Sequence, residues 1–252
     1  MKETQIIMGM PITIEISDVN KKFLVKKAMQ SAFDYFNYVD ETFSTYKASS
    51  EITKINNGFI APSSWSDDMK TIFTLAEATK EATHGYFDMV MPEGGIDPSG
   101  IVKGWSIHKA AELLAHAGIE HFCIDAGGDI EVRGEKSPGV SWMIGIRNPF
   151  DTEKVVKTVS LRDKGIATSG TYIRGDHIYN PHTKERKTDE LASITVIASD
   201  VYEADRFATA AFAMGKEGIL FLEQKEGLEG YMITYDGIAT MTSGFPLYTI
   251  SA

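Results

Sequence analysis

The stretch Asp97-Pro98-Ser99-Gly100-Ile101-Val102-Lys103-Gly104-Trp105 reads as a tight turn that leads into a helix. Asp, Pro, Ser and Gly favour turns, and the residues after Gly100 place apolar side chains at helical spacing. We expect a helix over about 101–117 with Ser99 as its N-cap. Because the N–H groups at a helix start bind phosphate well, this stretch is a candidate anion site. It also separates a helix-rich part of the chain from a strand-rich part.

A second candidate lies about a hundred residues later, in Ala204-Asp205-Arg206-Phe207-Ala208-Thr209. Asp205 and Thr209 are four residues apart, so both project from one face of a helix. An exposed Asp and a Thr bonded to its own turn would explain the pair without function. The surrounding residues are almost all apolar, however, and a buried carboxylate needs a partner. Mg²⁺ suits a set of carboxylate, hydroxyl and carbonyl oxygens and commonly acts with phosphate substrates.

The segments on either side predict an α+β fold with largely antiparallel sheets, packed helices and a single domain over residues 1–252. Alternating residues predict a strand within 5–17, and apolar spacing predicts helices over 21–39 and 67–83, the latter capped by Ser66 or Asp67. Asp236-Gly237 between two strand-like runs predicts a hairpin. The remaining predicted strands are 122–124, 130–132, 142–146, 155–161, 165–170, 177–181 and 194–198, and the remaining helices are 203–214 and 216–224.

Composition excludes several classes of protein. The chain has 252 residues, a formal net charge of -10 and no basic stripe, which argues against a nucleic-acid partner. The single cysteine, Cys123, excludes an internal disulfide and a cysteine-rich zinc site. No apolar run approaches the ~20 residues of a membrane span. Residues 1–10 lack the apolar core of a signal peptide, so we expect a cytoplasmic protein unless a leader has been removed.

Two further clusters carry polar side chains. Asp125-Ala126-Gly127-Gly128-Asp129 follows a strand, and its glycines suit either a sharp turn or a close approach to a ligand. Thr168-Ser169-Gly170 precedes His177-Ile178-Tyr179-Asn180-Pro181. His177 suits function and packing equally on local sequence, whereas the other five histidines are expected to be solvated. The motifs of serine hydrolases, zincins, Walker loops and dinucleotide-binding folds are absent.

Taken in order, these clusters and four earlier ones resemble the ApbE family of FAD:protein FMN transferases. The matching stretches are Met8-Gly9, Phe43-Ser44-Thr45-Tyr46, Ser50-Glu51-Ile52 to Asn56, Gly85-Tyr86-Phe87-Asp88, Asp97 to Trp105, Asp125 to Asp129, Thr168-Ser169-Gly170, His177 to Pro181 and Ala204 to Thr209. They span nearly the whole chain. The chain departs from the family pattern at Met10, where Thr is usual, and in a shorter stretch before Asp97.

The resemblance implies a mixed α/β fold with FAD in a cleft and Mg²⁺, or Mn²⁺ in its place, at the pyrophosphate. It implies that FAD is split, AMP is released and FMN is esterified to a Thr or Ser of a cytosolic acceptor protein. The implied metal ligands are Asp205, Thr209 and the carbonyl of Gly100, and His177 is the implied general base. The implied FAD contacts are Met8, Tyr46, Tyr86, Phe87, Asp88, Asp97, Lys103 and Tyr179.

Three other functions compete with the transferase. Water in place of the acceptor hydroxyl would make the same site an FAD pyrophosphatase. A flavin-binding protein without chemistry would not need the pair Asp205 and Thr209, and a structural module would need none of the polar clusters.

Overall fold

The computed structural model describes residues 1–18, 22–170, 179–184 and 190–250. Its centre is an eight-stranded sheet in the order β1-β2-β3-β4-β7-β8-β9-β10, and every neighbouring pair is antiparallel. This confirms the predicted fold class. The strands of this sheet are β1 Lys2–Ile7, β2 Met10–Ile16, β3 Phe122–Ala126, β4 Asp129–Arg133, β7 Lys164–Gly170, β8 Leu191–Ala198, β9 Glu229–Thr234 and β10 Ala239–Met241.

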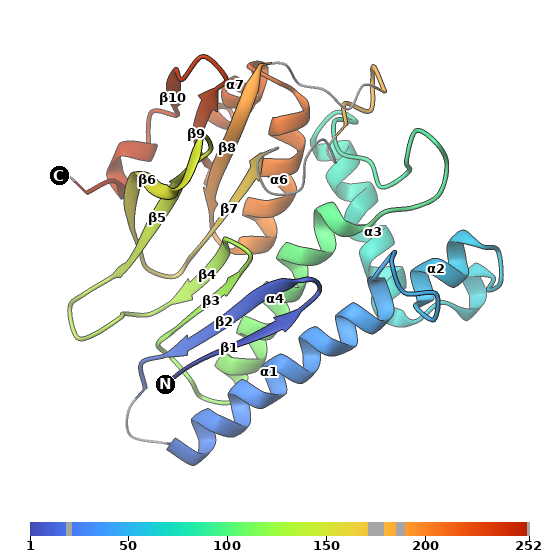
Figure 1. Cartoon of the computed structure of the whole chain (residues 1–252), viewed down its shortest axis with the longest axis horizontal. Coiled ribbons are helices and arrows are strands. Elements are labelled where there is room, and N and C mark those ends of the chain that lie inside the picture. Colours follow the sequence, from blue (N-terminus) through green and yellow to red (C-terminus); the bar gives the residue numbers. More distant parts are fainter. Residues whose placement is uncertain (19–21, 171–178, 185–189, 251–252) are drawn as a thin grey trace.

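Helices lie along one face of this sheet, where α1, α4 and α6 run side by side (Figure 1). The opposite face packs against a separate hairpin of β5 (Trp142–Asn148) and β6 (Asp151–Leu161). β8 is buried on both faces because it lies between these layers. The helices are α1 Lys22–Phe43, α2 Glu51–Asn56, α3 Asp67–Ala82, α4 Ser99–His116, α6 Val201–Ala213 and α7 Glu217–Glu223, with 3₁₀ turns at Pro62–Ser64 and Phe245–Tyr248.

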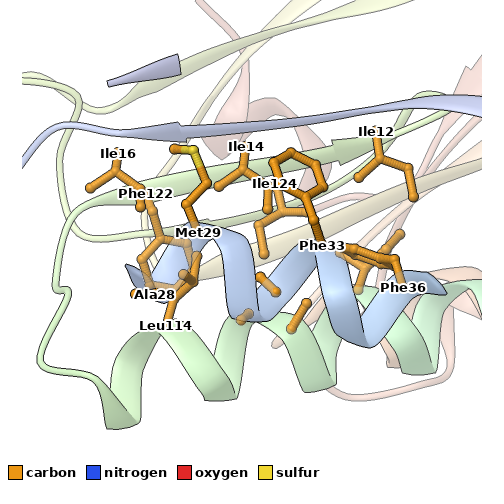
Figure 2. Packing of buried hydrophobic residues seen from close by; sticks show 14 of the residues in the cluster. Ile12, Ile14, Ile16, Ala28, Met29, Phe33, Phe36, Leu114, Phe122 and Ile124 are labelled. Atoms are coloured by element: carbon orange, nitrogen blue, oxygen red, sulfur yellow. The ribbon is translucent and has the colours of Figure 1, made fainter. Parts of the chain in front are cut away.

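The N-terminal core follows from residue spacing. Ile12, Ile14 and Ile16 point to one side of β2, because side chains alternate along a strand. They meet Met29, Phe33 and other apolar residues of α1, which recur every three or four positions (Figure 2). Leu114 of α4 closes this cluster from below in the same view. Alternation on the sheet and helical spacing on α1 therefore specify one shared layer.

Residues 5–17 contain the predicted strand, which is β2, together with the end of β1 and the turn between the two strands. They belong to a hairpin, and Met8 and Gly9 form its turn with φ of 56° and 71°. Two successive left-handed residues are typical of a two-residue hairpin turn whose twist matches the strands. The alternation belongs to β2 alone, because β1 reads Lys-Glu-Thr-Gln-Ile-Ile, so the pattern did not reveal the first strand or the reversal. The same turn type joins β3 to β4 at Gly127 and Gly128, with φ of 63° and 101°.

Helix starts were predicted with mixed success. Ser66 caps α3 by accepting a hydrogen bond from the Met69 N–H at 3.1 Å, as expected. Ser99 is not the cap of α4 but its first residue, and Pro98 occupies the cap position without a side-chain bond. The hairpin at Asp236 and Gly237 is confirmed. No helix in the described ranges is both long and apolar enough to span a membrane.

Candidate active site

The start of α4 contacts α6 at two glycines. The Gly104 N–H donates to Asp205 Oδ2 at 2.7 Å, and a Cβ on Gly104 would lie 2.6 Å from the Asp205 Cβ. One turn earlier, a Cβ on Gly100 would lie 3.3 Å from the Thr209 methyl and 3.8 Å from its hydroxyl oxygen. The two helices can therefore approach this closely only because both positions are glycine. This approach brings the two stretches singled out in the sequence together.

Asp205 is a buried charge, with 4% of its surface exposed. Its neighbours are the ammonium of Lys103, whose Nζ is 3.8 Å from Asp205 Oδ1, and a second carboxylate, Asp129. Lys103 also pairs with Asp129 at 2.5 Å. Burial raises the pKa of Asp205 to about 7, Lys103 opposes this rise and Asp129 adds to it. Two carboxylates and one ammonium leave this group one positive charge short of neutrality.

Asp205 and Lys103 face a cavity of about 280 Å³. Its walls come from the β1–β2 and β3–β4 turns, the loop before α4, the first turns of α4, the end of β7 and one face of α6. The lining residues are Gly9, Met10, Tyr86, Phe87, Asp88, Met91, Asp97, Ser99, Gly100, Lys103, Gly127, Thr168, Ser169, Gly170, Tyr179, Pro181, Asp205 and Thr209. Elements distant in sequence thus meet at one concave surface, which is typical of small-molecule sites.

Most of the predicted site residues lie on this cavity. Those that line it are Gly100, Asp205 and Thr209 of the implied metal set, and Tyr86, Phe87, Asp88, Asp97, Lys103 and Tyr179 of the implied FAD set. Met8 is outside the lining, although its neighbours Gly9 and Met10 belong to it. Tyr46 is 97% exposed and does not line the cavity. His177 lies outside the described residues, so its role stays a prediction.

Side-chain hydrogen bonds and an ion pair hold the 84–90 loop, which places Tyr86 and Phe87 on the cavity. The Tyr179 hydroxyl donates to the Val90 carbonyl at 2.5 Å, and Lys80 pairs with Asp88 at 2.7 Å. His182 was expected to be merely solvated. Instead its Nε2 lies 3.0 Å from the His84 carbonyl oxygen, and its ring meets the Tyr86 ring edge-on at 4.4 Å. Residues 179–184 therefore hold the 84–90 loop in place.

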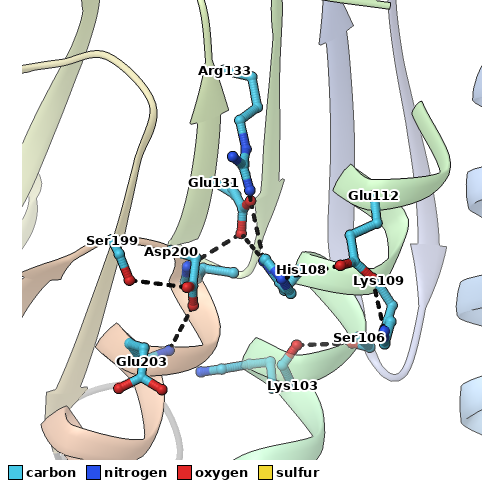
Figure 3. A network of polar contacts seen from close by, with 11 residues as sticks. Lys103, Ser106, His108, Lys109, Glu112, Glu131, Arg133, Ser199, Asp200 and Glu203 are labelled. Atoms are coloured by element: carbon cyan, nitrogen blue, oxygen red, sulfur yellow. Dashed lines mark hydrogen bonds and ion pairs between the residues drawn. The ribbon is translucent and has the colours of Figure 1, made fainter. Parts of the chain in front are cut away.

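A second buried carboxylate ties the helices to the sheet. Glu131 of β4 has no exposed surface and accepts from Arg133 Nη2 at 2.6 Å and from the Val201 N–H at 3.2 Å (Figure 3). His108 of α4 lies 3.1 Å from the same carboxylate, and this hydrogen bond raises the pKa of His108. The prediction that His108 is merely solvated was wrong. Glu131 thus joins α4, β4 and the first turn of α6 next to the cavity.

The residues present suit a magnesium-like cation. Asp205 supplies a buried carboxylate, and Thr209 and Gly100 supply hydroxyl and carbonyl oxygens within a space that a single added methyl group would crowd. Hard oxygen donors of this kind are the ligands of Mg²⁺. The described part of the chain holds no cluster of three or more His, Cys, Asp or Glu side chains placed for a metal. A cation here would therefore take neutral oxygens beside one carboxylate.

Met10, Met91 and Pro181 line the cavity and were not singled out as site residues. Apolar side chains near turns carry no chemical signature, so only their placement in space reveals them. The Met10 thioether lies 2.9 Å from the position that a Cβ on Gly127 would occupy, so the two hairpin turns pack directly together. The glycines of the β3–β4 turn therefore form the sharp turn that the sequence offered as one alternative, and approach to a ligand there stays a prediction.

Comparison with known proteins places this site in a family. The model of the ApbE family matches residues 8–93 and 91–232. The FAD:protein FMN transferase of Escherichia coli K12 is 32% identical over 182 residues, which are 68% of this chain and 52% of that protein. The Treponema pallidum protein of the same name is 29% identical over 167 residues, covering 59% of this chain and 46% of its own length. The chain spans about half the length of the curated relatives it matches.

Solved structures share the fold over the whole chain. The flavin transferase ApbE of Vibrio cholerae superposes with a TM-score of 0.83, at 23% identity and 98% coverage of both chains. The ApbE protein of Thermotoga maritima gives a TM-score of 0.82 at 20% identity, covering 100% of this chain and 99% of the other. At these identities the likeness establishes the architecture. With the family model matched along most of its sequence, the chain belongs to the ApbE family.

Proposed function

We propose that this chain is a Mg²⁺-dependent FAD:protein FMN transferase. In this reaction the hydroxyl oxygen of an acceptor Thr or Ser forms a bond to the phosphorus of the FMN half of FAD. The bond between that phosphorus and the oxygen of AMP breaks, AMP leaves, and the hydroxyl proton passes to a base. The observation that carries the proposal is the single cavity where the start of α4, Lys103 and the pair Asp205 and Thr209 meet.

The cavity supplies what a pyrophosphate needs. The N–H groups at the start of α4 and its positive end attract phosphate oxygens. The Lys103 ammonium lines the same wall and is held there by Asp129. Tyr86 and Phe87 offer aromatic surface on the loop before α4, which suits a flat ring system. One lining thus combines anion-binding and ring-binding groups, as expected for a dinucleotide.

Asp205, Thr209 and the Gly100 carbonyl would hold the divalent cation. When bound, the cation would neutralise the charge of the pyrophosphate and the charge that develops on departing AMP. The buried Asp205 carboxylate gains the counter-charge that burial otherwise denies it. The Gly104 N–H keeps one Asp205 oxygen fixed and thereby orients the other.

We propose His177 as the general base. Gly170 and Tyr179, the described residues on either side of the segment that contains it, both line the cavity. His177→Ala should slow FMN transfer by about 10²–10⁴-fold, the range for a positioned acid–base group, while FAD affinity is kept. The transfer rate is measured from the flavin attached to the acceptor at timed intervals, and the FAD affinity is measured by fluorescence titration. An unchanged transfer rate would remove His177 from the mechanism.

The direct test is intact-protein mass spectrometry of a candidate acceptor domain incubated with the enzyme, FAD and Mg²⁺. We expect the acceptor mass to rise by one FMN less one water, and AMP to appear in equal amount. Release of FMN and AMP with no labelled protein would identify an FAD pyrophosphatase instead. Recovery of intact FAD would identify a binding protein without chemistry.

A further inference from the structure

Asp129 lies behind Lys103 at the start of β4, outside the cavity that holds the candidate cation ligands. Lys103 and Asp205 line that cavity, whereas Asp129 lines a smaller one of about 80 Å³ and not the larger. Only 2% of the Asp129 surface is exposed. A molecule bound in the larger cavity therefore meets Lys103 and Asp205, and any part that Asp129 plays there is indirect.

Both oxygens of the Asp129 carboxylate are held. Oδ1 accepts the Thr168 N–H of β7 at 3.1 Å, and Oδ2 lies 2.5 Å from Lys103 Nζ. No described residue donates a well-aligned hydrogen bond to Oδ2, so this buried oxygen depends on the Lys103 ammonium for its counter-charge. The sheet therefore supplies a fixed anchor for the end of a long and flexible side chain.

Lys103 also lies within reach of Asp205. Its Nζ is 3.8 Å from Asp205 Oδ1, which is beyond hydrogen-bond distance. The other oxygen, Oδ2, accepts the Gly104 N–H at 2.7 Å, so Oδ1 is the one left for a cation. A small rotation of the flexible lysine stem would bring the ammonium onto Oδ1. An ammonium and a metal ion would exclude each other there, because like charges repel strongly in a buried site.

We propose that Asp129 is a positioning residue that holds the Lys103 ammonium away from Asp205 Oδ1 and so keeps this oxygen open for the divalent cation. The inference rests on the proposed metal-dependent transferase and adds a residue to it. Two carboxylates share one ammonium in this group. The ammonium sits on the carboxylate outside the larger cavity, which leaves the carboxylate that lines the cavity to the cation.

The test measures binding of Mn²⁺ to the full chain, first alone and then with FAD, from the electron paramagnetic resonance signal of the free ion. Asp129→Asn keeps the side-chain shape and an acceptor for the Thr168 N–H, but it loses the charge that holds Lys103. We expect the ammonium to move to Asp205 and the Kd for Mn²⁺ to rise by roughly 10–100-fold, the value of one hydrogen bond between charged groups.

Asp125→Asn provides the matched control. Asp125 flanks the same β3–β4 turn, accepts the Gly128 N–H at 2.9 Å and does not line the larger cavity. The Kd for Mn²⁺ should therefore stay at the wild-type value in this variant. An equal rise in both asparagine variants would show a general effect of negative charge at this turn and would overturn the proposal.

Lys103→Met separates the action of Asp129 through Lys103 from the direct effect of its charge. Without the ammonium, Asp129→Asn should change the Kd far less than it does in the lysine protein, because the two residues act as one unit. The same change in both backgrounds would contradict the proposed role.

A crystal structure of Asp129→Asn gives a second readout that does not need the methionine variant. Lys103 Nζ should lie about 2.7–3.2 Å from Asp205 Oδ1, and an ammonium that stays away from Asp205 would overturn the inference. Equal Mn²⁺ binding by the wild type and Asp205→Ala would instead count against the cation site of the proposed function, and against the role of Asp129 with it.

Discussion

Asp205 is a buried carboxylate that lacks a positive partner of its own. It lies between two closely packed helices, shares Lys103 with Asp129, and keeps only the Gly104 N–H as a backbone donor. Burial raises its pKa to about 7 because the charged form loses its water. In the unfolded chain the pKa of this side chain is 3.8. At pH values between these two pKa values, the folded protein therefore keeps a proton on Asp205 that the unfolded chain has released.

This shift has a defined consequence for stability without metal. Between pH ~4 and ~7 the folded state holds more protons than the unfolded state, so the free energy of unfolding falls as pH rises. Asp205→Asn removes this fall, since Asn stays neutral and can still accept from Gly104. In EDTA we expect the variant to match the wild type near pH 4 and to exceed it by roughly 1–4 kcal/mol above pH 7. Urea denaturation across this range measures the difference, and a gap that shrinks as pH rises would contradict it.

The contact between α4 and α6 depends on Gly104 at the level of elements. A Cβ there would lie 2.8 Å from the Val201 carbonyl oxygen, a backbone atom that cannot turn aside. Gly104→Ala gains about 1 kcal/mol of helix propensity. We nevertheless expect a net loss of roughly 1–3 kcal/mol in unfolding free energy, because the helices must separate.

Glu112→Ala provides the control for Gly104→Ala. It changes a half-exposed position of the same helix and creates no such overlap, and the ion pairs that it removes, with Lys109 and His108, are solvent-accessible and contribute little. Urea denaturation of both variants should show a loss for Gly104→Ala alone. A Gly104→Ala protein as stable as the wild type, with unchanged FAD affinity, would show that the helices do not need this glycine.

Sequence spacing predicted most elements but not their junctions. The helices over 67–83 and 101–117 and the Asp236-Gly237 hairpin follow from local rules of capping, periodicity and turn formation. The Met8-Gly9 turn was not predicted because the polar strand before it, Lys2 to Ile7, shows no alternation that would identify it as a strand. Helix α2 was not predicted because its six residues are too few to display a helical period.

For the whole molecule, the site is assembled by contacts that local patterns do not encode. Asp205 and Thr209 could be recognised by their spacing. Their contacts with Gly104 and Gly100 depend on the packing of two helices about a hundred residues apart in sequence. The bond between His108 of α4 and Glu131 of β4 likewise joins a helix to a strand. Met10 stood out in the sequence only as a departure from the family pattern, and its place on the cavity follows from the packing of the two hairpin turns.

The assembled cavity predicts a preference between flavins. One wall of the cavity holds the start of α4, Lys103 and the cation ligands. This set of groups suits a pyrophosphate better than a terminal phosphate alone. With Mg²⁺ present we expect FAD to bind roughly 10–100-fold more tightly than FMN, the value of one or two charge-assisted contacts. Fluorescence titration of both flavins, with and without EDTA, measures this. Equal affinities for FAD and FMN in Mg²⁺ would show that the site does not bind the pyrophosphate.

AMP release from FAD by Asp205→Ala, assayed with and without Mg²⁺, tests the central claim most directly. The change removes the one carboxylate assigned to the cation and leaves the hydroxyl of Thr209 and the Gly100 carbonyl, two neutral oxygens that hold Mg²⁺ poorly. Thermal melting in EDTA checks that the variant folds, and Asp205→Asn provides a second, near-isosteric form. We predict that both variants release AMP only at the Mg²⁺-free rate of the wild type. Mg²⁺-dependent release at the full wild-type rate would contradict the assignment of Asp205 and, with it, the cation site.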